Sequence, residues 1–312
     1  MKMRSKFLAL LLAVSMTCSA AACGSADDNK KDAGDPVTKD TSADNETDGN
    51  NDADVDIYAA AQEKMKEIKS LNGKMTADIS MTMSANGESQ SLDTSSTVDM
   101  SCFYDPVQFK ADISMDAGEA GSSNMTMYAE ASEDGTYTMY ISDGANWQSQ
   151  SVQMDDLEAY DAAGNITNYM QDSYHFQDAG TEQVDGKAAR KYTGVITGDD
   201  MQETVMSTGV LDSLTSAGLD TSQLESMFQD LGDLPITLWI DEAEYYPVKY
   251  EMDMTEMMNS MMSNVLASMG DQAEGVTMEY TKAQISMTCS DYNAAADFTI
   301  PDEAKAAATP AE

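Results

Sequence analysis

The sequence predicts an α+β fold built mainly from antiparallel strands. Several segments alternate apolar and polar residues with a period of two, which turns one face of a strand toward a core and the other toward water. Turn pairs such as Asn86-Gly87 and Asp143-Gly144 separate successive segments of this kind. Two stretches, 54–73 and 253–270, carry apolar residues at helical spacing instead. Strands joined by tight turns, each with one polar face, are typical of an antiparallel meander.

A helix is expected to open the folded part of the chain. Either Asp54 or Asp56 can accept hydrogen bonds as its N-cap. Asn72-Gly73 is expected to end it, because glycine after a helix favours the left-handed conformation of a C-cap. Between these limits the apolar residues recur every three or four positions, at Ile57, Ala61, Met65 and Ile68.

Strands are expected next, in the segments 74–83, 95–106, 107–116, 123–132 and 135–150. The middle of the chain, 152–180, has helical spacing in short pieces, and 199–230 is expected to be helical with a break at Gly218. A hairpin with its turn at Asp185-Gly186 lies between these two parts. Two further strands, the methionine-rich helix and a last strand follow in the segments 234–254, 253–270 and 275–293.

The last strand changes its apolar phase near Lys282. Before that residue the apolar positions are Val276, Met278 and Tyr280, and after it they are Ala283, Ile285 and Met287. A shift by one residue would move the apolar set to the other face of the sheet, so the sequence predicts a β-bulge here.

The N-terminus has the features of a secretory signal. A positive start is followed by the apolar run Phe7–Val14, which is too short to span a bilayer, and by three alanines and Cys23. This arrangement resembles a bacterial lipobox, which implies cleavage before Cys23 and attachment of diacylglycerol to it, with fatty acids such as palmitate. We therefore expect a signal peptide over 1–22, a disordered acidic tether over 23–54, a folded domain over 55–302 and a frayed tail over 303–312.

Charge and composition exclude several classes of function. The formal net charge of −38 argues against nucleic acid as a partner. No segment after the signal approaches 18 apolar residues, so no transmembrane helix is predicted. We expect a monomer on the outer face of the cell membrane, attached through its N-terminal lipid. Cys102 and Cys289 remain after lipidation of Cys23, and two alternatives stay open for them: a disulfide between an early and the last strand, or two buried free thiols.

The order of parts resembles the LolA-like lipoprotein fold. The resemblance rests on the N-terminal helix with its meander, on the hairpin "VDGKAARKYTGVI", and on Trp239-Ile240-Asp241 followed by Pro247-Val248-Lys249. It covers roughly residues 55 to 302 and includes the mycobacterial lipoproteins of the LppX and LprG type. It implies a curved antiparallel half-barrel covered by helices, with a hydrophobic cavity between sheet and helices. This chain departs from soluble lipoprotein carriers in its lipid anchor and in its inserted methionine-rich segment.

The methionine-rich segment 253–270 has three interpretations. Six of its eighteen residues are methionine, and at helical spacing they form one apolar face. They can act as core residues in place of leucine, as a deformable wall for an apolar ligand, or as thioether ligands of Cu(I). The absence of accompanying His or Cys, and the abundance of methionine in the strands, argue against a metal site.

The expected function is non-covalent binding of an apolar ligand, a lipid or the acyl part of a lipoprotein, without enzymatic activity, cofactor or metal. The one histidine, His175, has no nucleophile motif around it. The alternative is a structural, interaction or sensing protein of the cell envelope whose core is filled by its own side chains. The residues expected to contact the ligand come from the strand faces and from the methionine-rich helix as a lid: Met75, Ile79, Met81, Phe109, Ile113, Met125, Met127, Met258, Met261 and Met262.

Overall fold

The computed structural model describes residues 56–85, 87–118, 121–132, 135–153, 157, 160–168, 170, 174–200, 230–273 and 275–307. The predicted signal peptide, Cys23, the tether up to residue 54 and most of the expected helical segment 199–230 lie outside these residues.

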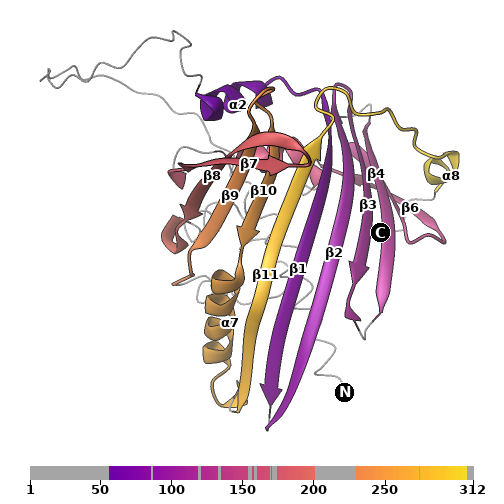
Figure 1. Cartoon of the computed structure of the whole chain (residues 1–312). Helices are drawn as coiled ribbons and strands as arrows, with labels where there is room; N and C mark the ends of the chain where they lie inside the picture. The colour runs from indigo at the N-terminus through magenta and orange to yellow at the C-terminus, as the bar shows by residue number, and fades with distance from the viewer. Residues whose placement is uncertain are drawn as a thin grey trace, which may run out of the picture.

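One curved antiparallel sheet of eleven strands dominates the described structure (Figure 1). The strand order is β6-β5-β4-β3-β2-β1-β11-β10-β9-β8-β7, so the first six strands form one meander and the last five return to place β11 beside β1. The predicted fold class, α+β with a curved antiparallel half-barrel covered by helices, is confirmed. The strands are β1 Ser70–Ala85, β2 Glu88–Tyr104, β3 Val107–Asp116, β4 Ser122–Ala131, β5 Tyr137–Ser142, β6 Trp147–Val152, β7 Gln177–Val184, β8 Lys187–Ile196, β9 Leu234–Asp241, β10 Pro247–Asp253 and β11 Val276–Ser290.

The three central strands β2, β1 and β11 are the longest, with 17, 16 and 15 residues. Their register breaks once between β1 and β11, where Ser80 pairs with Lys282 but Met81 pairs with Tyr280. The skipped residue, Thr281, is a bulge, and it returns the apolar side chains of the lower half of β11 to the inner face. The bulge predicted near Lys282 is therefore confirmed.

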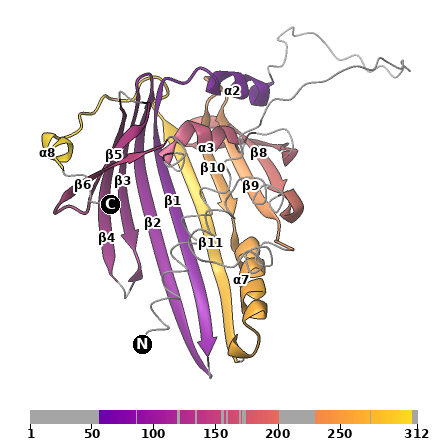
Figure 2. The same cartoon turned by 180° about the vertical axis from the view of Figure 1, so that it is seen from behind.

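Helices close one end of the half-barrel. Helix α2 (Ile57–Met65) lies above the upper ends of the strands, and helix α3 (Ala162–Asn168) lies below it, across the upper parts of the central strands (Figure 2). Asp56 is the N-cap of α2, since its carboxylate accepts hydrogen bonds from the backbone N–H groups of Tyr58 and Ala59. Of the two capping residues that the sequence allowed, the structure uses Asp56. The remaining described helices are α7 (Thr255–Met269), the 3₁₀ turn η4 (Gly270–Ala273) and α8 (Asp302–Lys305).

The predicted end of the first helix is wrong. Helix α2 ends at Met65, and Asn72-Gly73 lies inside strand β1. Leu71 is fully buried opposite Cys102 of β2, so tertiary packing holds this segment in the sheet. Gly73 is required there for close approach and not for a cap: a Cβ atom would lie 2.7 Å from the Met287 methyl carbon and 3.2 Å from the Ala162 Cβ.

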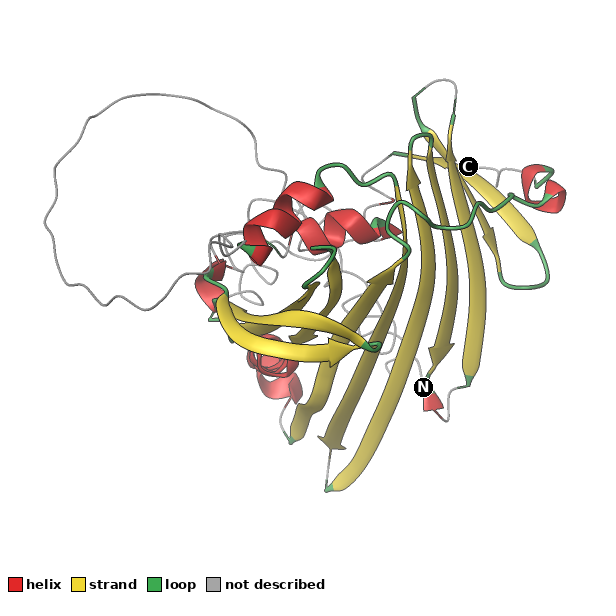
Figure 3. Ribbon diagram, turned by 45° about the horizontal axis from the view of Figure 1, so that its top comes forward, coloured by secondary structure: helices red, strands yellow, loops and turns green. Residues whose placement is uncertain are grey.

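The C-terminal segment differs from the expected frayed tail. After β11 the chain runs across the convex face to α8, as Figure 3 shows from above. Ala304 is fully buried, and Ile300 packs with it against Tyr140. Lys305 forms an ion pair with Glu130 on β4. The expected tail began at residue 303, but the chain is packed against the sheet through this helix, because the outer face of β4–β6 carries aromatic side chains that need cover.

Candidate ligand-binding face of the half-barrel

The sheet brings the predicted strand residues together on its inner face. Paired residues of neighbouring antiparallel strands point to the same side. Met75 pairs with Val98, Val98 with Ile113, and Ile113 with Met125, which makes one apolar row across β1, β2, β3 and β4. A second row runs one step nearer the helices, through Gly73, Met100, Ala111 and Met127.

A third row lies directly beneath α2 and α3. It consists of Leu71, Cys102, Phe109 and Ala129, and all four are fully buried. The face is thus continuous and apolar from the helices downward, and the seven strand residues named from the sequence share it.

Exposure varies along this face, and it rises most sharply on β4. In the second row Met127 is 1% exposed, whereas in the first row Met125 is 37% exposed. Met75, Ile79 and Ile113 are half-buried, and they pack against the core at its margin. The helix-proximal part of the face is therefore a filled core. Beyond it the face opens to solvent at Met125 on β4, whereas Met81 on β1 is buried again.

Helix α7 holds its four central methionines inside the structure. Met257, Met258, Met261 and Met262 are all buried, and all join the same core cluster as the strand residues. The three named from the sequence, Met258, Met261 and Met262, are thus placed against the strand residues by the fold. Met81 is also buried, and it pairs with Tyr280 of β11, the strand on which α7 packs.

The position of α7 differs from that of a lid over the sheet. Strand β10 pairs with β11 only from Lys249 to Asp253, and α7 follows directly along the rest of the β11 edge. The Met254 N–H donates to the Ala283 carbonyl at 2.7 Å. The Asn259 amide then pairs with both backbone groups of Tyr280. The helix therefore extends the wall of the half-barrel at its edge.

Asn259 is a residue that the sequence analysis missed. Its side chain bonds to both backbone groups of one β11 residue, and the Thr255 hydroxyl adds a third contact by accepting from the Ala283 N–H at 3.0 Å. In the sequence Asn259 is one of several Asn and Ser residues on the polar half of a helix. Nothing in the helical spacing distinguishes it from Asn264, because the edge that it covers comes from a distant strand.

Both cysteines of the described structure are free and buried. Strand β1 separates their strands, so the Cα atoms are about 10 Å apart across the sheet. A disulfide needs Cα atoms within about 7 Å. Of the two alternatives left open by the sequence, the structure has the free thiols.

Burial also makes these thiols unreactive. Desolvation raises the pKa of Cys102 to about 12, and the thiol donates to the Tyr160 carbonyl at 3.2 Å. Burial likewise raises the pKa of Cys289 above its usual range. A nucleophilic cysteine needs a lowered pKa, so neither thiol has the environment of a catalytic group.

A partly buried polar cluster beside Cys102 anchors α3. The Tyr104 hydroxyl donates to the Asp161 carboxylate at 2.6 Å, and the same carboxylate oxygen accepts from the Gly164 N–H at 2.9 Å. Asp161 thereby caps the start of α3, and Tyr104 fixes that cap to the sheet. This cluster explains how the helix is held over the core, and its hydrogen bonds are all internal.

Among the described residues no group of three or more His, Cys, Asp or Glu side chains is arranged to hold a metal ion. His175 is exposed and has a positive φ of 47°. None of the described helices is both long and apolar enough to cross a membrane.

Comparisons with known proteins give one family and several similar folds. A family model described as "Family of unknown function (DUF6612)" matches residues 53–309. No curated protein matches the chain. Among solved structures the chain is similar to LprF from Mycobacterium bovis, with 16% identity over 80% of this chain and 95% of that one and a TM-score of 0.43.

Two further solved structures match with lower scores. Lipoprotein LppX of Mycobacterium tuberculosis has 16% identity over 78% of this chain and 99% of that one, with a TM-score of 0.37. A LolA superfamily protein from Nitrosomonas europaea has 12% identity over 79% and 94%, with a TM-score of 0.17. Both kinds of protein that the sequence resembles are thus among the matches.

Proposed function

We propose that this chain, which belongs to the protein family of unknown function DUF6612, binds an apolar ligand such as a lipid or an acyl chain non-covalently. The ligand would lie on the distal part of the inner face, between the strands and α7. Binding would make and break no covalent bond, so the proposal is for a carrier or receptor and not for an enzyme.

One observation carries this proposal: the inner face is still apolar at Met125, where it is open to solvent. Met125 is 37% exposed although it lies in the same row as the half-buried Ile113 and Met75. A soluble domain normally places polar side chains where a sheet meets water, as the outer face of these strands does. An apolar row on a concave face that is partly open to solvent is typical of a ligand site.

The driving force would be removal of apolar surface from water. Each Å² buried contributes about 25 cal/mol, so a contact of about 300 Å² would give roughly 7 kcal/mol before the cost of association. Methionine suits such a wall because its three flexible torsions and polarisable sulfur adapt to ligands of different shape. The fixed position of α7 would keep this adaptable surface next to the sheet.

Attachment to the membrane is the second part of the proposal. Cys23 would carry diacylglycerol, and the acidic segment from 24 to 54 would hold the domain away from the lipid surface. The support is the lipobox-like sequence that ends at Cys23 and the acidic composition that follows it. Ligand binding and anchoring together describe an extracytoplasmic lipoprotein that handles an apolar molecule near the membrane.

A second candidate function rests on the filled part of the core. Phe109 and Met127 were expected to contact the ligand, and they are 0% and 1% exposed. If the whole face behaved like these two residues, the domain would be a structural or sensing protein without a ligand. Whether the row that contains Met75, Ile113 and Met125 binds an apolar ligand decides between the two functions.

The deciding experiment uses the chain with Cys23→Ser, which keeps it free of lipid modification. Native mass spectrometry and organic-solvent extraction would detect a co-purified lipid, and a fluorescent fatty acid would report binding to the emptied protein. We expect Met125→Glu to weaken binding of the fatty acid at least tenfold. The matched control is Val195→Glu, an apolar residue 44% exposed on the outer face of β8.

Equal loss of binding in both variants, or no fatty-acid binding and no lipid adduct in the parent chain, would reject the apolar-ligand function and favour the self-filled alternative. Unfolding curves of both variants would show whether a loss comes from instability.

A further inference from the structure

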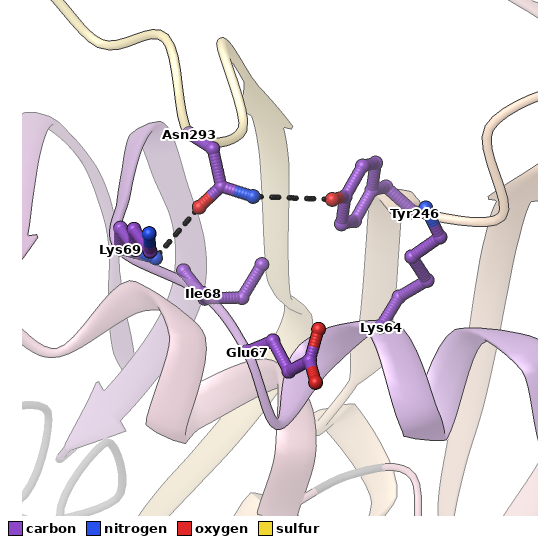
Figure 4. A pocket seen from close by; sticks show the side chains of 6 residues that line it. All are labelled: Lys64, Glu67, Ile68, Lys69, Tyr246 and Asn293. Carbon is purple, nitrogen blue, oxygen red and sulfur yellow. Dashed lines mark hydrogen bonds between the residues drawn. The ribbon is translucent and has the colours of Figure 1, made fainter.

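A polar pocket, chemically different from the inner face, lies outside the half-barrel at its closed end. It is an open pocket of about 730 Å³ lined by Lys64, Glu67, Ile68, Lys69, Tyr246 and Asn293 (Figure 4). Lys64 belongs to the last turn of α2, and the next three residues belong to the link between α2 and β1. Tyr246 comes from the β9–β10 turn, and Asn293 from the turn after β11.

Hydrogen bonds fix the polar side of this pocket. The Lys69 N–H donates to the Asn293 side-chain oxygen at 2.6 Å, which sets the orientation of that amide. The Asn293 amide nitrogen therefore donates to the Tyr246 hydroxyl oxygen at 3.2 Å. The Tyr246 O–H donates to no other group among the described residues, so it is available to a ligand in the pocket.

The Tyr246 ring is held equally firmly. It stacks on Tyr292 with ring centres 4.4 Å apart and planes 6° from parallel. The preceding residue, Tyr245, has a φ of 62°, an unusual conformation for a bulky side chain. Positions of this kind persist where the surrounding structure imposes them, and they are frequent in binding sites.

The charge of the pocket is unusual for so acidic a chain. Lys64 and Lys69 both line it, and within the described ranges neither forms an ion pair with a carboxylate. Lys64 instead lies over the Tyr246 ring, with its Nζ atom 5.2 Å from the ring centre. The other basic side chains of those ranges all form ion pairs: Lys66, Lys74, Lys110, Lys187, Arg190, Lys191, Lys249, Lys282 and Lys305.

We propose that this pocket binds a phosphate group, with the Lys64 and Lys69 ammonium groups supplying positive charge and the Tyr246 hydroxyl supplying a neutral donor. A phosphate offers acceptor oxygens in several directions, which matches donors that come from two distant parts of the chain, the α2–β1 stretch and the β9–β10 turn. Lysine binds phosphate as a compact point charge and needs no planar geometry. The phosphate can belong to a small soluble ester or to the headgroup of an anionic phospholipid.

Two sources of negative charge oppose phosphate binding at this site. The net charge of −38 repels anions at a distance, but at physiological salt this effect is screened beyond about 8 Å. Glu67 is the carboxylate that lines the pocket itself, and its side chain is exposed. Glu67 should weaken phosphate binding. It should also favour ligands whose phosphate lies closer to Lys64 and Lys69 than to its own carboxylate.

The test is titration of the whole chain, carrying Cys23→Ser, with inorganic phosphate and with phosphatidylglycerol vesicles. We expect Lys64→Gln and Lys69→Gln each to weaken binding three- to tenfold, and Glu67→Gln to strengthen it. The matched control is Lys66→Gln, since Lys66 lies in the same region but pairs with Glu63 and does not line the pocket. Binding should also weaken as salt is raised.

Binding of phosphate but not vesicles identifies a soluble ester as ligand, and binding of vesicles with weak phosphate binding identifies a lipid headgroup. No binding of either, or the same loss in Lys66→Gln as in Lys64→Gln, overturns the proposal. The site is independent of the apolar face, so Met125→Glu should leave phosphate binding unchanged while it weakens fatty-acid binding at least tenfold.

Discussion

Asn259 of α7 forms two hydrogen bonds with the backbone of Tyr280 on β11: its amide nitrogen donates to the Tyr280 carbonyl at 2.9 Å, and its side-chain oxygen accepts from the Tyr280 N–H at 2.8 Å. One side chain thus replaces a paired strand at the point where β10 has ended. Unpaired strand edges invite association with other chains, and a helix across the edge is one way to protect them. The methionine-rich helix is therefore part of the architecture as well as part of the inner wall.

Replacing Asn259 by alanine should destabilise the fold. Both backbone groups of Tyr280 would lose their partners in a partly buried place, at a cost of about 2–4 kcal/mol in the free energy of unfolding. The exposed edge should also increase self-association. Urea unfolding and analytical ultracentrifugation would measure the two effects. Ser263→Ala, at an exposed position of the same helix, should change neither.

Gly73→Ala should destabilise the core by about 1–3 kcal/mol, because the added methyl group would lie 2.7 Å from the Met287 methyl carbon. Shortening that neighbour by Met287→Leu should recover part of the loss. A double-mutant cycle of thermal unfolding measures the coupling. Additive effects of the two substitutions would contradict the steric explanation.

The two buried thiols should resist alkylation in the folded protein. Cys102 and Cys289 are buried, and desolvation raises the pKa of both. Mass spectrometry after treatment with iodoacetamide at pH 8 should show no modification of either residue until urea is added. Rapid labelling of one cysteine without denaturant would contradict this account of its surroundings.

Stability should fall at alkaline pH because of Cys102. Its pKa is about 12 in the folded state against an ordinary value of 9.0. The unfolded chain therefore loses this proton first, and the folded form is disfavoured as pH rises from about 9 to 12, by up to about 1.4 kcal/mol per pH unit. Below pH 9 the contribution is fully present. Unfolding free energies of the parent and Cys102→Ala, compared between pH 8 and 10.5, should diverge in slope.

Ala304→Asp should detach the C-terminal helix. Ala304 is fully buried against β5 and β6, and a carboxylate there would have to leave the interface or lose its hydration. The fluorescence of Trp147, which packs in this cluster, should shift toward that of an exposed indole. Glu303→Ala, at an exposed neighbouring position, is the control and should leave the spectrum unchanged.

Local patterns predicted most of the sheet correctly. The alternation of Met75 to Met83 and of Phe109 to Met115 depends only on which face meets water, so it is visible in the residues themselves. The hairpin at Asp185-Gly186 was equally visible, because its turn needs two positive φ angles, here 50° and 80°. The phase shift near Lys282 predicted the bulge for the same reason.

The element boundaries that were predicted wrongly are those set by packing against residues distant in the sequence. Asn72-Gly73 has the composition of a helix end, but Leu71 gains more from burial opposite Cys102 than the helix gains from another turn. The expected tail has no apolar period of its own, and its packing depends on the aromatic residues of β4, β5 and β6.

The sequence by itself determined the face that each strand turns inward, the bulge in the last strand and the amphipathic character of the methionine helix, because these follow from the period of the apolar residues. Tertiary structure decided how deep each inward residue lies, so that Met127 is buried and Met125 exposed in the same strand. It also decided that α7 lies along the edge of β11, and that two lysines meet Tyr246 and Asn293 at one pocket. These relationships join residues up to 229 positions apart in the chain. The periodic patterns of a sequence are local and do not extend over such distances.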